Sequence, residues 1–176
     1  SEGDAIYLIA PEFWAKPDPV RSHLGKSLWL KEVHGRDEGR APPVDLAAER
    51  GAGQIVLKLI EEGLLSAVHD CSDGGLAVTL AEMALAGNIG AEVSANEAYT
   101  AAQWWFGEDQ SRYVVTVSQD KVEAFNAIVA EGPESEAAAL VGFTRLGKVG
   151  GDSLLGVKLD DMRAANERFF QEWMEG

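Results

Sequence analysis

The residues best suited to chemistry lie in one short run, residues 69–76, which reads HDCSDGGL. A strand-like stretch ends at Asp70, the chain turns through two glycines, and an apolar helical pattern begins at Leu76. Glycines permit positive φ or close approach to a ligand, and the free amides at a helix start favour an anion such as phosphate. Carboxylates beside phosphate are typical Mg²⁺ ligands, which makes Asp70 a candidate metal ligand. The predicted phosphate- or nucleotide-binding turn comprises Asp70, Ser72, Asp73, Gly74 and Gly75.

The same run also fits a simpler interpretation. In an ordinary strand-to-helix turn, Ser72 or Asp73 would cap the helix, and the full phosphate-loop pattern is absent. His69 favours a structural hydrogen bond over catalysis. For Cys71, no His–Asn or His–Asp pattern accompanies the thiol, and neighbouring carboxylates would raise its pKa, so we predict no covalent role.

A second motif, residues 106–112 (FGEDQSR), leads into the strongest strand pattern of the chain. Glu108 and Gln110 have side chains that bind a sugar hydroxyl, an amide or a metal, and Arg112 is suited to pairing with a phosphate. The alternative is a solvated turn with an ion pair at its rim. The sequence therefore predicts these three residues as binding candidates, with that alternative left open.

The surrounding pattern predicts the elements that would position both motifs. Strands are expected over residues 4–10, 66–70, 91–94 and 112–117, and helices over 45–63, 75–88, 121–130 and the C-terminal stretch from about residue 160. Residues 29–43 are expected to form a loop, mobile over 31–43, and residues 139–149 and 154–159 a closing hairpin. This order predicts an α/β (α+β) fold with helices packed on a mixed sheet.

Composition limits the class of protein. The 176 residues fit one domain, and the net charge of −14 argues against binding a nucleic-acid backbone. No apolar run approaches the roughly 20 residues of a membrane helix, and no signal peptide is evident. A single cysteine cannot form an internal disulfide, which suits the cytoplasm. The chain starts at Ser1, so residues 1–3 are expected to be a linker or a cloning remnant.

Three stretches carry a resemblance to a known family: residues 68–83, residues 106–115, and residues 24–30, the last followed by residues 43–46. Together they resemble the C-terminal domain of the aminoimidazole ribonucleotide synthetase superfamily. Within it they are most similar to the large (type II) subunits of phosphoribosylformylglycinamidine synthase. Lys26 stands where a second glycine is usual in the family stretch. The resemblance covers nearly the whole chain, from Asp4 through the final helix, and residues 1–176 are expected to form a single domain. It implies a largely antiparallel sheet with helices packed on it.

The resemblance implies a fragment of an ATP-dependent carbon–nitrogen ligase of purine biosynthesis. That enzyme uses ATP and Mg²⁺ to convert formylglycinamide ribonucleotide to formylglycinamidine ribonucleotide. Its partners would be its own N-terminal domains, a glutaminase subunit and a small accessory subunit. The resemblance also implies the second of two C-terminal domains, whose cleft is auxiliary, so no residue is assigned a catalytic role and the fragment alone is expected to be inactive.

Two other functions remain open at this stage. One is a stand-alone nucleotide- or phosphate-binding regulatory module. The other is a different member of the same superfamily, namely an aminoimidazole ribonucleotide, selenophosphate or thiamine-phosphate enzyme. The residue types at positions 72–75 and the spacing of Glu108 and Gln110 argue against a different member of the superfamily.

Overall fold

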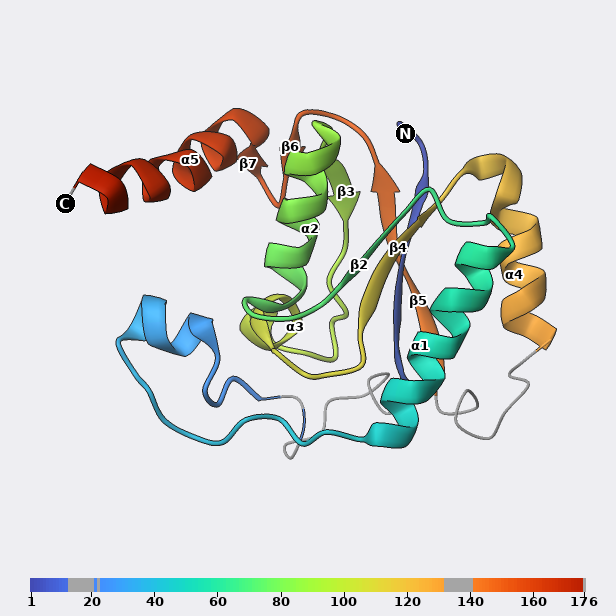
Figure 1. Cartoon of the computed structure of the whole chain (residues 1–176), viewed down its shortest axis with the longest axis horizontal. Coiled ribbons are helices and arrows are strands. Elements are labelled where there is room, and N and C mark those ends of the chain that lie inside the picture. The colour runs from blue at the N-terminus through green and yellow to red at the C-terminus, as the bar shows by residue number, and fades with distance from the viewer. Residues whose placement is uncertain (13–20, 22, 132–140, 176) are drawn as a thin grey trace.

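A seven-stranded sheet organises the molecule, in the order β2-β4-β1-β5-β3-β6-β7 (Figure 1). This computed structural model describes residues 1–12, 21, 23–131 and 141–175. The strands are β1 (Ala5–Pro11), β2 (Ala67–Asp70), β3 (Ala91–Val93), β4 (Tyr113–Val117), β5 (Val141–Val149), β6 (Ser153–Leu154) and β7 (Val157–Lys158). The helices are α1 (Leu46–Glu61), α2 (Gly75–Gly87), α3 (Ala101–Phe106), α4 (Val122–Glu131) and α5 (Leu159–Glu175), with short η2 (Trp29–Val33) and η3 (Gln119–Lys121).

The sheet is largely antiparallel, as the resemblance implied. The pairs β1–β4, β1–β5, β2–β4, β3–β5 and β6–β7 are antiparallel, and β3–β6 is parallel. Strand β1 lies between β4 and β5 and is buried along its whole length. The predicted α/β (α+β) class is therefore confirmed.

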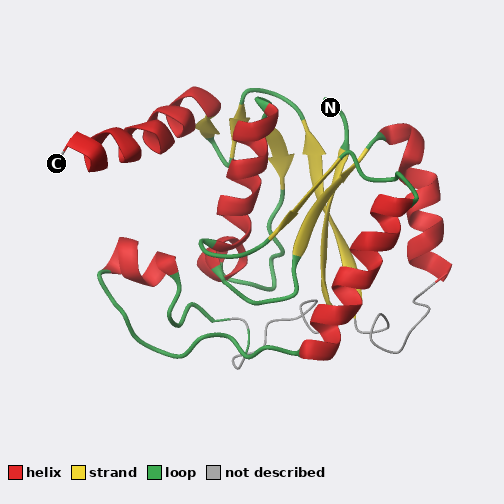
Figure 2. Cartoon of the chain, viewed as in Figure 1, coloured by secondary structure: helices red, strands yellow, loops and turns green. Residues whose placement is uncertain are grey.

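Alternating side chains of β1 divide the core into two layers, because successive residues of a strand point to opposite faces. Ile6, Leu8 and Ala10 face a cluster that includes Leu76 and Leu80 of α2. Ala5, Tyr7 and Ile9 belong to the opposite cluster, which includes residues of α1 and α4. Figure 2 shows the same arrangement, with α2 on one side of the sheet strands and α1 and α4 on the other.

Helix α1 follows the sequence prediction closely. Asp45 Oδ1 accepts hydrogen bonds from the amides of Ala47 and Ala48 at 3.1 Å, which satisfies two free amides of the first turn. Gly63, just beyond the helix, has φ +65°, a conformation that favours glycine. The two ends of this helix were therefore readable from residue types alone.

The predicted closing hairpin is wrong. Strand β5 does not pair with β6, because β3 lies between them in the sheet. The hairpin that forms instead joins β6 to β7 through Leu155 and Gly156, both at positive φ (50° and 82°). Two central residues at positive φ give the turn whose twist suits a tight hairpin. Residues 139 and 140 of the expected strand lie outside the described residues.

Three further elements differ from expectation or extend it. The expected loop over residues 29–43 begins with the helical segment η2. Helix α3, with Thr100 as its capping residue, was not predicted. The first half of α5 packs on the body through Leu159 and Met162, whereas its second half extends away from the sheet and leaves Trp173 75% exposed (Figure 1).

Candidate functional site

The predicted strand–turn–helix is present, and both of its glycines are needed. Gly74 and Gly75 have φ of +80° and +66°, which side-chain-bearing residues rarely adopt. A Cβ on Gly75 would lie 2.5 Å from the carbonyl oxygen of Gly107. Gly75 therefore allows a close approach between the turn and the backbone of the second motif, whereas a Cβ on Gly74 would meet the side chain of Val78 on α2.

At the start of α2, one backbone amide is hydrogen-bonded to a side chain that is distant in the sequence. Gly74 occupies the N-cap position, and no local side chain caps the helix there. Instead the Gly74 amide donates to Glu108 Oε1 at 2.9 Å. The expectation that Ser72 or Asp73 caps the helix is therefore wrong, because Gly74 is the N-cap residue and no side chain caps the helix there. An ordinary structural turn remains compatible with this geometry.

Glu108 also contacts the third stretch of the family resemblance, residues 24–30. Its Oε1 accepts a second hydrogen bond, 2.8 Å long, from the amide of Leu28. Beside it the rings of Trp29 and Phe106 stack with centroids 4.0 Å apart and planes at 19°. The structure thus gathers in one place the three stretches on which the family resemblance depended.

Lys26 shows what replaces glycine in the first stretch. Its φ is 60°, in the left-handed region that favours glycine. Its backbone amide donates to Glu38 at 2.9 Å, and its Nζ lies 2.9 Å from Asp37 Oδ1. Asp37 and Glu38 lie on the same loop as Lys26. The Lys26 side chain is therefore directed toward an acidic neighbour on its own loop.

Arg112 departs from the sequence expectation. Its side chain is 1% exposed, and its Nε and Nη2 donate to the backbone carbonyls of Asp109 (2.8 Å) and Gly107 (2.5 Å). A guanidinium buried in this way is held inside the domain, where it shapes the turn that presents Glu108. This geometry does not support the expected phosphate contact, which stays a prediction.

The remaining candidates lie at the surface of the same region. Asp70 has its side chain 65% exposed, and Ser72, Asp73 and Gln110 are exposed as well. Gln110 Nε2 donates to the carbonyl of Glu108 at 3.3 Å. These four side chains are available to a ligand, and their role in binding stays a prediction.

His69 makes the structural contacts expected of it. Its Nδ1 lies 2.7 Å from the carbonyl oxygen of Asp70, and its Nε2 lies 3.3 Å from Glu82 Oε2 on α2. The imidazole therefore bridges β2, at the end of the sheet order, to the helix that covers it.

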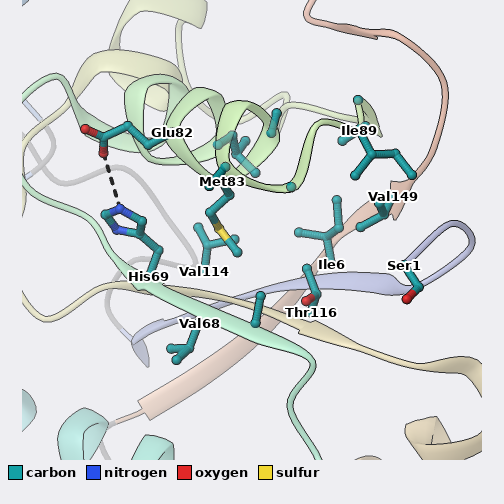
Figure 3. A pocket seen from close by; sticks show the side chains of 17 residues that line it. Ser1, Ile6, Val68, His69, Glu82, Met83, Ile89, Val114, Thr116 and Val149 are labelled. Atoms are coloured by element: carbon teal, nitrogen blue, oxygen red, sulfur yellow. Dashed lines mark ion pairs between the residues drawn. The ribbon is translucent and has the colours of Figure 1, made fainter. Parts of the chain in front are cut away.

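An apolar cavity lies between α2 and the sheet, next to His69 (Figure 3). Its volume is about 580 Å³, and its lining includes Val68, Met83, Ile89 and Val114. His69 and Glu82 stand at one end, and Ser1 and Val149 lie toward the other. None of the predicted binding residues lines it.

Magnesium was expected at Asp70. The described residues hold no group of three or more His, Cys, Asp or Glu side chains placed to bind a metal ion. A Mg²⁺ ion on a nucleotide usually keeps several waters and takes one or two carboxylates. Asp70 could supply one such carboxylate, and its role as a magnesium ligand stays a prediction.

Two contacts at this site escaped sequence reasoning. Glu49 of α1 accepts a hydrogen bond from Ser111 Oγ (2.7 Å) and one from Tyr113 Oη (3.4 Å). The other is the stack of Trp29 on Phe106. In both cases the partners are more than 60 positions apart, and no local pattern relates them.

A family model described as "AIR synthase related protein, C-terminal domain" matches residues 1–158. This match spans most of the chain and ends where α5 begins. The chain therefore belongs to this family, and it does so as a C-terminal domain with a helical extension.

Among individual proteins, the chain is similar to the phosphoribosylformylglycinamidine synthase subunit PurL of Erythrobacter litoralis. The two are 65% identical over 173 residues, covering 98% of this chain and 23% of the relative. The chain thus spans about a quarter of the length of that relative. The sequence-based resemblance to the large synthase subunits is confirmed.

Solved structures support the fold. The chain is similar to Thermotoga maritima PurL complexed with FGAR, with a TM-score of 0.64 and 19% identity over 86% of this chain and 25% of that one. The same protein complexed with ATP gives a TM-score of 0.60 and 19% identity, covering 88% and 23%. At this identity the likeness concerns the arrangement of strands and helices.

Proposed function

We propose that this chain is the C-terminal domain of a phosphoribosylformylglycinamidine synthase large subunit. The whole enzyme would use ATP and Mg²⁺ to amidate formylglycinamide ribonucleotide, and this domain would be inactive alone. The observation that carries the proposal is the 65% identity to one quarter of such a subunit. The convergence of the three motifs around Glu108 supports it from the structure.

Within the domain, we propose that the exposed edge around the signature turn faces the rest of the enzyme and its nucleotide. Asp70, Ser72, Asp73 and Gln110 are the residues available there. Asp70 is the candidate for a single Mg²⁺ ligand, completed by phosphate oxygens and water. Arg112 is left out because its guanidinium is buried.

Partners follow from the same proposal. The domain would dock on the N-terminal domains of its own subunit, and the complete enzyme would receive ammonia from a glutaminase subunit with a small accessory subunit. Since the sequence contains one cysteine, which is buried, a reducing cytoplasm is the proposed location.

A domain exchange tests this function directly. The corresponding quarter of the Erythrobacter litoralis subunit is replaced by this chain, and ATP-dependent amidation with ammonia as the nitrogen donor is measured. We expect the hybrid to retain activity, because the exchanged segments are 65% identical over 173 residues. Deleting the quarter without replacement should abolish activity, and the native subunit is the reference.

The isolated chain provides the opposing test. With ATP, Mg²⁺ and formylglycinamide ribonucleotide it should show no turnover, and turnover would contradict the fragment proposal. Calorimetry with ADP and Mg²⁺ separates the alternative of a stand-alone binding module. Micromolar binding that is lost in Asp70→Asn would favour the module, and absence of heat favours the fragment.

A further inference from the structure

One carboxylate oxygen joins three distant parts of the chain. Glu108 Oε1 accepts from the amide of Gly74 at 2.9 Å and from the amide of Leu28 at 2.8 Å. The two donors lie 34 and 80 residues from Glu108 along the sequence. Hydrogen bonds to a charged acceptor are stronger than those between neutral groups, so this oxygen is a strong link between the signature turn and the region of Leu28.

The region of Leu28 is itself tied together. Ser27 Oγ donates to the Leu24 carbonyl at 2.7 Å and accepts from the Leu30 amide at 3.3 Å. The Lys26 amide donates to the Glu38 carbonyl at 2.9 Å. These hydrogen bonds link residues 24–38 to one another. The hydrogen bond from the Leu28 amide to Glu108 therefore restrains the whole segment.

A second contact lies beside the carboxylate. Trp29, the residue after Leu28, stacks on Phe106, which is two positions before Glu108. The stack contributes apolar contact. Glu108 fixes the relative orientation of the two segments, because the amides of both must point at one oxygen. The apolar stack tolerates sliding in a way that the hydrogen bonds do not.

We propose that Glu108 is a positioning residue that clasps residues 24–38 onto the Gly74–Gly75 turn, so that the two move together. A shift at the turn then reaches residues 24–38 through a single carboxylate, and the reverse also holds. The clasp goes beyond the function proposed above, because it rests on contacts within this chain. Its failure would leave the domain-exchange result untouched.

Amide hydrogen exchange of the whole chain, read by NMR, tests the clasp. In Glu108→Ala both amides lose their acceptor, so exchange at Leu28 and Gly74 should become about tenfold faster or more, while β1 stays unchanged. Glu108→Gln keeps an oxygen that can accept both bonds and should restore most of the protection. Glu123→Gln, the same change at an exposed position on α4, is the matched control.

A second pair of variants tests the loop side without altering Glu108. Leu28 has φ −58°, which suits proline, and Leu28→Pro removes the donated hydrogen. Leu28→Ala removes the side chain and keeps the donor. We expect Leu28→Pro, and not Leu28→Ala, to speed exchange at Lys31 and Gly35, with Gly74 still protected by Glu108.

Several results would overturn the clasp. The first is that, in Glu108→Ala, the amides of Leu28 and Gly74 exchange within about twofold of the wild-type rate. Another is a Glu108→Gln variant as fast as Glu108→Ala. If Glu108→Ala does not fold, the Leu28 pair decides, and equal exchange in Leu28→Pro and Leu28→Ala contradicts the proposal.

Discussion

Glu108 and Arg112 show how residues of one motif can take opposite roles. Both have side chains that favour ligand binding, and they are four positions apart. Arg112 turns inward and binds backbone carbonyls, whereas Glu108 reaches across the surface to two amides. A buried guanidinium needs acceptors, and the carbonyls of the tight turn supply them. In this structure both side chains therefore make contacts within the chain.

We expect Arg112→Lys to lower the free energy of unfolding by about 2 kcal/mol or more, because an ammonium cannot span the two carbonyls that the guanidinium fork binds. Urea unfolding measures the loss. Arg36→Lys is the matched control at an exposed ion pair with Glu38, and it should change stability by about 0.5 kcal/mol or less. Equal effects at the two positions would contradict the structural role of Arg112.

Cys71 and Tyr113 give a prediction about alkaline pH. Burial raises the pKa of the Cys71 thiol, and burial together with Glu49 raises the pKa of the Tyr113 hydroxyl. The unfolded chain releases these protons first, so their stabilising contribution is complete below the unfolded values, about 8.5 for cysteine, and declines as pH rises beyond them.

The measurement for this prediction is the unfolding free energy in urea across that alkaline range, under reducing conditions. Cys71→Ala, which has no proton to lose, should show a shallower decline than the wild type. If the unfolding free energies of the two proteins fall in parallel, Cys71 does not cause the loss of stability. Native Cys71 should also react slowly with thiol reagents, because the thiolate is the reactive form.

At the scale of elements, the closeness of α2 to the second motif makes Gly75 irreplaceable. Gly75→Ala adds a Cβ 2.5 Å from the Gly107 carbonyl at φ +66°. Gly63→Ala has the same backbone strain, at φ +65°, with no atom within 4 Å. We expect the first to cost about 2 kcal/mol more than the second, since overpacking adds to strain. Thermal unfolding of the two variants measures the difference, and equal losses would show that strain alone matters.

The element scale also shows where local patterns fail. Helix α1 and strand β4 were predicted because their signals are local: a capping aspartate, helical spacing and a β-branched run. The hairpin prediction for residues 139–159 failed because β3, some 50 positions earlier, takes the place next to β5. Neighbouring strands in sequence often pair, and nothing local in this segment marks the exception.

For the whole molecule, the net charge of −14 is the dominant global property. Like charges repel one another in the compact state, and salt screens that repulsion. We expect the melting temperature to rise by a few degrees between about 0.02 M and 0.3 M sodium chloride. Chloride is chosen because sulfate strengthens apolar burial by a separate effect. A melting temperature that is constant or falls with chloride would contradict this account.

No helix among the described residues is long and apolar enough to cross a membrane. Helix α5 lies beyond the region that the family model matches, and its second half carries Phe169, Trp173 and Met174 at the surface. The absence of nucleic-acid binding stays a prediction from charge.

The sequence by itself determined the order of most elements, the α/β (α+β) class and the family, because capping residues, periodicity and the run at residues 69–76 are local signals. The tertiary structure decided which of the motif residues face inward, which receives the Gly74 amide, and which strand lies beside β5. These depend on contacts between positions tens of residues apart, and chain folding sets such contacts by packing, burial and the need to satisfy buried polar groups.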